Sequence, residues 1–257
     1  MSQEPIPVEP IPVEPTNLVF VFDASGSMEK LLPRLVNSYN TEILATHKKT
    51  FSNAVDINGI VPSNELCHVS MITFSGRDQI NVVFKDAPIQ DLEPIAKNQL
   101  VADGMTALRT TIVFIDNMLS TLRYPERKTM IFILTDGEDT DSCREHTPHA
   151  ISAIFQRYEK TKLDTPKTCI SATLIGSNQD AVMTGDSLGL PNNCALTFND
   201  DNIDDAMSSV KRMVSRVLSG EDSSPMIIED DRIQSCPNYM PSANSADFEI
   251  IDDDSCY

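Results

Sequence analysis

Short apolar runs rich in β-branched and aromatic residues alternate along the chain with segments of helical periodicity. The strand-like runs lie at 18–22, 66–74, 80–84, 130–134, 169–175 and 195–198. The helix-like segments lie at 31–43, 108–122, 147–158, 180–188 and 206–217. Strands separated by helices of this length pair through crossovers, which give a mostly parallel sheet with helices on both faces. The pattern therefore predicts an α/β fold, a three-layer α/β/α sandwich around a doubly wound sheet.

One connection between strands is too short for such a crossover. The runs 66–74 and 80–84 are separated by a stretch that begins Ser75-Gly76-Arg77-Asp78. A turn of this length joins antiparallel neighbours. We therefore expect these two strands to form a hairpin.

Charge and proline content divide the chain into a central domain and two flanks. Residues 4–15 repeat Glu-Pro-Ile-Pro-Val, and prolines at this density hold the backbone in an extended polyproline conformation. Residues 220–257 carry ten acids against Arg232 alone and few periodic apolar residues. We predict a proline-rich extended linker at 1–15, one folded domain at 16–219 and an acidic disordered tail at 220–257.

Composition also bears on partners and compartment. A formal net charge of −18 repels phosphate backbones, so nucleic acid is not an expected partner. The chain shows neither a signal-like start nor an apolar run of about 18 residues, so we expect no membrane association. Its six cysteines form no Cys-x-x-Cys pair. They favour reduced thiols in the cytoplasm over a disulfide framework. The oligomeric state does not follow from the sequence.

Three predicted loops carry oxygen ligands at the end of a strand or the start of a helix. The first is Asp23-Ala-Ser25-Gly26-Ser27, where a carboxylate and two hydroxyls converge and Gly26 would let the turn bend. The others contain Thr106 before a long helix and Asp136 after a buried strand. Hard oxygen donors suit Mg²⁺, with Mn²⁺ or Ca²⁺ as alternatives, rather than zinc.

These motifs, in this order, resemble the metal-ion-dependent adhesion site of von Willebrand factor A domains. The resemblance covers residues 17–219, and the stretch from Leu174 to Ala181 further resembles stand-alone intracellular A domains of bacteria, phages and large DNA viruses. It implies a Rossmann-like sheet with one antiparallel edge strand, a cation at its top and partner recognition without catalysis. It also implies a ligand set, with Asp136 bound directly or through water: Asp23, Ser25, Ser27, Thr106 and Asp136.

A cation held mostly by neutral hydroxyls stays electrophilic and keeps positions that water fills. The helix after Ser27 points its positive end toward the same place, which favours an anion. We therefore expect a divalent-cation-dependent protein-binding module that captures an Asp or Glu carboxylate of a partner protein.

Two other functions stay open. One is a scaffold subunit of a larger assembly with a structural metal, and the other is a metal-assisted hydrolase. The hydrolase has less support, because Asp23-Ala-Ser25 lacks the second acid of an Asp-x-Asp phosphatase and no Walker A loop or Gly-x-Ser-x-Gly motif is present. We expect no enzymatic activity.

Acidic residues outside the ligand set have two interpretations each. Glu138, Asp139 and Asp141 either form a second Ca²⁺ site or, as favoured here, shape the rim of the first. The blocks 229–231 and 252–254 either solvate the tail or supply a tethered carboxylate that competes for the metal.

Overall fold

The computed structural model describes residues 11–56, 58–59, 61–165, 168–177 and 181–236. Their centre is a six-stranded sheet in the order β5-β4-β2-β6-β7-β8. The strands are β2 (Thr16–Asp23), β4 (Cys67–Phe74), β5 (Ile80–Pro88), β6 (Lys128–Thr135), β7 (Ile170–Ser177) and β8 (Ala195–Phe198). All neighbours pair in parallel except β4 and β5, which are antiparallel. The predicted sheet, hairpin and antiparallel edge strand are confirmed.

The central strands are apolar throughout because helices cover both faces of the sheet. Every residue of β2, β4 and β6 is buried. Alternate residues face opposite layers: Phe20 and Phe22 of β2 pack into one core, and Val19 and Val21 pack into the other. This two-sided burial explains why the strands appear in the sequence as unbroken apolar runs.

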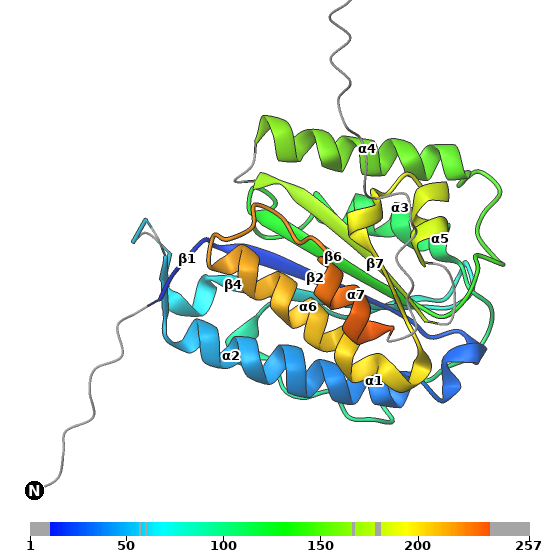
Figure 1. The fold of residues 1–257 in the computed structure, drawn as a ribbon, viewed down its shortest axis with the longest axis horizontal. Coiled ribbons are helices and arrows are strands. Elements are labelled where there is room, and N and C mark those ends of the chain that lie inside the picture. Colours follow the sequence, from blue (N-terminus) through cyan, green and yellow to red (C-terminus); the bar gives the residue numbers. More distant parts are fainter. Residues whose placement is uncertain (1–10, 57, 60, 166–167, 178–180, 237–257) are drawn as a thin grey trace, which may run out of the picture.

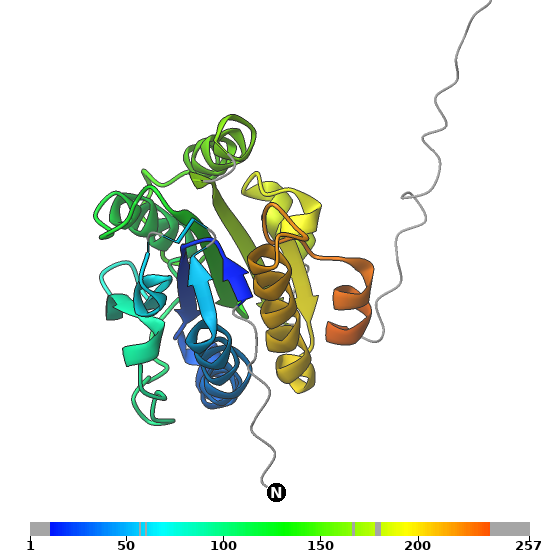
Figure 2. The same cartoon turned by 90° about the vertical axis from the view of Figure 1, so that its left-hand side faces the viewer.

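Two helical layers enclose the sheet, as Figures 1 and 2 show. One layer holds α1 (Leu32–Ser38), which continues through a π-helical turn (Tyr39–Leu44) into α2 (Ala45–Ser52), together with α6 (Ile203–Leu218). The other holds α3 (Leu108–Leu119), α4 (Pro148–Asp164) and α5 (Ala181–Ser187). The three-layer α/β/α sandwich is thereby confirmed. No helix in the described part of the chain is both long and apolar enough to cross a membrane.

The predicted linker is partly wrong. Ile11–Val13 forms a short strand, β1, that pairs in parallel with β3 (Ala54–Asp56). Val13 is buried in the core beneath it. Residues 11–13 therefore belong to the domain, and residues 1–10 lie outside the described residues.

The predicted disordered tail is also wrong for its first part. Glu229–Ser235 forms the helix α7, which packs against α6 and β8. Ile227 is buried, and its backbone N–H donates to the carbonyl of Asn193 at 2.9 Å. Residues 237–257, including the acidic block 252–254, lie outside the described residues.

A buried histidine makes the fold sensitive to acid. His47 of α2 is fully buried, and neither ring nitrogen has a hydrogen-bond partner among the described residues. Burial, with a smaller effect of Lys211, lowers its pKa to about 4 from the ordinary 6.5. Above pH 6.5 the ring is neutral in both the folded and unfolded chains, so it adds no pH dependence.

Between pH 6.5 and 4 only the unfolded chain binds the proton, so stability falls as pH falls. From pH 7 to pH 5 we expect His47 to cost about 2 kcal/mol of unfolding free energy. Urea unfolding of the wild type and His47→Leu at both pH values measures this effect. Between pH 7 and pH 5, His47→Leu should lose about 2 kcal/mol less unfolding free energy than the wild type. Equal losses in the two proteins would contradict the prediction.

Candidate metal centre

Three loops meet at the carboxyl edge of the sheet, the right-hand end of Figure 1. The first follows β2, which ends at Asp23, and the third follows β6, which ends at Thr135. The second loop precedes α3, which begins at Leu108. β2 and β6 are adjacent parallel strands, so their carboxyl ends lie side by side.

The first loop is held by its own ligand candidates. The Ser25 backbone N–H donates to Asp23 Oδ1 at 2.7 Å, and the hydroxyl oxygens of Ser25 and Ser27 lie 3.1 Å apart. Gly26 does not provide the bend that the sequence suggested, because its φ is not positive. The required glycine is Gly104 of the second loop, with φ +79°, and its carbonyl accepts from the Gly26 N–H at 3.0 Å.

Side chains connect the first loop to the third. Ser27 Oγ donates to Asp136 Oδ1 at 2.8 Å. Thr135 Oγ1 donates to Asp23 Oδ2 at 2.6 Å. Asp23, Ser25, Ser27 and Asp136 therefore form one continuous cluster. Thr135 is a member that sequence reasoning did not assign, although it belongs to the same Thr-Asp-Gly motif as Asp136.

Thr106 brings the second loop against the third. Its carbonyl accepts the N–H groups of Thr140 at 2.8 Å and Asp141 at 2.9 Å. A Cβ placed on Gly137 would lie 3.4 Å from Thr106 Oγ1, which puts this hydroxyl next to the residue after Asp136. The structure therefore joins four of the predicted ligands through hydrogen bonds and places the fifth, Thr106, next to the residue that follows Asp136.

The electrostatics of the cluster favour a cation. Asp23 is fully buried, and burial raises the pKa of its carboxyl group, while hydrogen bonds from Thr135 and Ser25 oppose that rise. Burial likewise raises the pKa of Asp136, against the hydrogen bond from Ser27. Among the described residues no basic side chain forms an ion pair with either acid. A divalent cation would provide the missing positive charge.

The oxygen spacing also suits magnesium. Mg²⁺ binds oxygens at about 2.0–2.1 Å in an octahedron, so ligands at adjacent corners lie about 3 Å apart. The Ser25–Ser27 and Ser27–Asp136 oxygen pairs, at 3.1 and 2.8 Å, match this separation. The donor set of the cluster therefore fits a small hard cation.

The acidic side chains next to the cluster form ion pairs with arginines. Asp139 pairs with Arg109 Nε at 2.5 Å, and Asp141 pairs with Arg77 Nη2 at 2.7 Å. Within the described ranges no three His, Cys, Asp or Glu side chains group as metal ligands. The rim interpretation of these acids is favoured over a second Ca²⁺ site. Sequence reasoning missed both arginines because each lies at least 30 residues from its partner.

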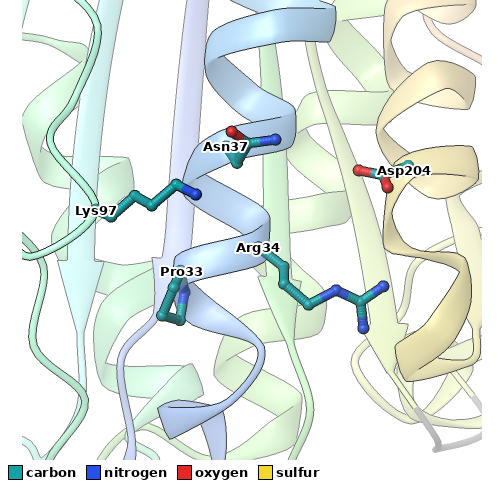
Figure 3. A pocket seen from close by; sticks show the side chains of 5 residues that line it. All are labelled: Pro33, Arg34, Asn37, Lys97 and Asp204. Carbon is teal, nitrogen blue, oxygen red and sulfur yellow. The ribbon is translucent and has the colours of Figure 1, made fainter.

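The helix after the first loop, α1, is anchored to its neighbour in the same layer, α6, and to the turn that precedes α6. Figure 3 shows Arg34 of α1 reaching toward the start of α6, beside Asp204. Its guanidinium donates to the carbonyl oxygens of Asp200 at 2.7 Å and Asp201 at 3.1 Å. Ser38 of α1 donates to Asp204. These contacts fix the helix that leads away from Ser27.

The family model of the von Willebrand factor type A domain matches residues 17–179, more than half of the chain. The chain belongs to the von Willebrand factor type A domain family. Domains of this family are protein-interaction modules. The comparison with curated proteins gives no match.

Solved structures share the fold at low sequence identity. The von Willebrand factor domain of a type V pili tip protein from Porphyromonas gingivalis is 11% identical, with 80% of this chain and 97% of that chain covered and a TM-score of 0.53. A von Willebrand factor type A protein from Catenulispora acidiphila is 15% identical, with 78% and 42% covered and a TM-score of 0.50.

Proximal thread matrix protein 1 from the mussel byssus, described with a zinc-occupied MIDAS motif, is 16% identical, with 80% and 48% covered and a TM-score of 0.47. This chain therefore spans less than half of the Catenulispora and mussel proteins.

Proposed function

We propose that this domain binds one divalent cation, preferentially Mg²⁺, through Asp23, Ser25, Ser27, Thr106 and Asp136. The observation that carries the proposal is the cluster that joins Asp23, Ser25, Ser27 and Asp136 around a buried acid without a basic partner. When bound, the ion would supply an electrophilic centre with positions open to an oxygen ligand from outside.

The same site then acts as a protein-binding centre in our proposal. The cluster offers two carboxylates and three hydroxyls, so the ion keeps part of its positive charge. An Asp or Glu side chain of a partner protein is the ligand that this charge favours. No histidine, lysine or cysteine among the described residues hydrogen-bonds to the five ligands, and the two carboxylates of the cluster are assigned to the ion, so we assign no general base for hydrolysis. We therefore propose binding without catalysis.

Titration with short blocked peptides tests the proposal. An aspartate peptide and its asparagine counterpart are added to ¹⁵N-labelled protein with Mg²⁺ or with EDTA. We expect the amide resonances of Ser25, Ser27 and Thr106 to shift only with aspartate and only with Mg²⁺. Equal shifts in EDTA, or with asparagine, would refute carboxylate capture.

The scaffold alternative gives a different result in the same experiment. A purely structural metal would raise the melting temperature but leave the resonances insensitive to the aspartate peptide. If Mg²⁺ raises the melting temperature but the aspartate peptide shifts no resonance, the metal has a structural role and the proposed binding function is rejected.

A further inference from the structure

Exposed apolar side chains gather around the candidate metal centre. Val101 is 74% exposed, Met105 is 51% exposed and Met183 is 68% exposed. Met105 directly precedes the predicted ligand Thr106, and Val101 lies in the same loop. Exposed apolar groups that surround a polar centre are typical of interaction surfaces.

A cavity of about 350 Å³ opens beside this centre between α3, α4 and α5. The buried side chains of Leu108 and Leu188 form its apolar floor, and the exposed Pro148 and Met183 stand at its rim. Pockets of about 300 Å³ and more hold small ligands, so an aliphatic side chain has room here.

The cavity and the metal centre share a wall. Arg109, three residues after Thr106, donates from its backbone N–H and its Nε to Asp139, three residues after Asp136. This pair joins the second and third loops and also lines the cavity. A segment bound at the metal centre therefore has the cavity within reach on the side of the Arg109–Asp139 pair.

The charges around the cavity select its occupant. Arg109 and Asp139 neutralise one another at 2.5 Å, so this wall presents no net charge. Glu138 is exposed at the edge of the cavity and forms no ion pair that the structure describes. An acidic occupant would be repelled by Glu138, whereas an aliphatic side chain fits the neutral wall and the leucine floor.

We infer that the partner protein binds through a short segment that carries an aliphatic side chain, of leucine, isoleucine or methionine type, within a few residues of its metal-binding carboxylate. The carboxylate binds at the metal centre and the aliphatic side chain enters the cavity. The inference rests on the proposed function. Burial of the apolar side chain adds affinity and keeps water away from the ion.

A panel of blocked peptides tests the inference. Each peptide carries one aspartate and one leucine, separated by zero to three glycines in either order, and the reference peptide carries aspartate and glycine only. With Mg²⁺ present, we expect the best-spaced leucine peptide to bind at least about tenfold more tightly than the reference.

The variant Met183→Gln, which keeps a similar size and adds no charge, should remove most of that gain. Leu163→Gln is the matched control, because Leu163 is 84% exposed at the far end of α4. It should keep the gain, and both variants should keep the Mg²⁺-dependent binding of the reference peptide.

The outcomes separate the two proposals. Mg²⁺-dependent binding of the reference peptide with no leucine advantage at any spacing would overturn this inference and leave the proposed function intact. A leucine advantage that survives Met183→Gln would also overturn it. No Mg²⁺-dependent binding of any peptide would overturn both.

Discussion

In Asp23→Asn, Mg²⁺ no longer raises the stability of the domain, while the metal-free variant unfolds at the same temperature as the metal-free wild type or higher. The reason is the burial of Asp23 without a basic partner, which penalises its charge and raises its pKa when no cation is present. Asparagine keeps an oxygen that accepts the Ser25 N–H but carries no charge.

The expected effect is large. Loss of groups that only support a metal ligand costs about 10–100-fold in affinity, so loss of a charged ligand should exceed about 100-fold. At a hundredfold excess of Mg²⁺ over its dissociation constant, the wild type gains about 2.7 kcal/mol that the variant lacks. Thermal unfolding with EDTA and with Mg²⁺ measures the difference.

Asp164→Asn is the control, because Asp164 is an exposed acid at the opposite end of α4 from the third loop. It should respond to Mg²⁺ as the wild type does. A full Mg²⁺ response in Asp23→Asn would show that Asp23 is not a required metal ligand. A variant that is unfolded in EDTA would show that Asp23 has a structural role.

The second large effect concerns α7. Asp231 is fully buried and accepts hydrogen bonds from Arg212 Nη2 at 2.7 Å and from the Ile228 N–H at 3.2 Å. Arg216 Nη2 lies 3.4 Å from the same carboxylate. In Asp231→Ala we expect the unfolding free energy to fall by about 3 kcal/mol, because Arg212 loses its buried counter-charge and the Ile228 N–H loses its acceptor, while Arg216 keeps Asp222.

Urea unfolding of three proteins checks this prediction. Asp230 is the exposed neighbour of Asp231 on the same helix, so Asp230→Ala should stay within about 0.5 kcal/mol of the wild type. Equal unfolding free energies of Asp230→Ala and Asp231→Ala would mean that the Asp231 carboxylate does not stabilise the domain.

Because α7 is a folded helix, a truncation that tests the acidic tail has to leave α7 in place. Asp231 forms ion pairs with Arg212 and Arg216, both of α6, so the block 229–231 does not supply a free carboxylate through this residue. Truncation after Ser219 would remove α7 and uncover β8. Truncation after Cys236 leaves α7 in place and is the proper test of whether the block 252–254 competes for the metal.

The sequence predicts most of this fold because its signals are local. Residues 18–22 and 130–134 are continuous apolar runs, which become two-sided buried strands. The helix at Pro148 begins after Thr147, whose hydroxyl accepts the Ala150 N–H at 3.2 Å as an N-cap. The proximity of the first and third loops follows from the same logic, because β2 and β6 are adjacent parallel strands that end side by side.

The features that the sequence did not predict depend on partners far along the chain. The seven residues of α7 contain too few apolar positions to show helical periodicity, and their stability comes from Asp231 and its arginines. The strand at 11–13 forms only because β3 lies beside it. Gly104, rather than Gly26, takes the left-handed conformation, which depends on how the second loop crosses the first.

Location of a bound Mn²⁺ ion by anomalous X-ray diffraction tests the central claim most directly, because Mn²⁺ takes the same oxygen ligands as Mg²⁺. We expect one strong peak bonded to the hydroxyls of Ser25 and Ser27, with Asp23, Thr106 and Asp136 around it. A crystal at saturating Mn²⁺ with no peak between these three loops, or with its only peak elsewhere on the domain, would show that the five residues do not hold the cation.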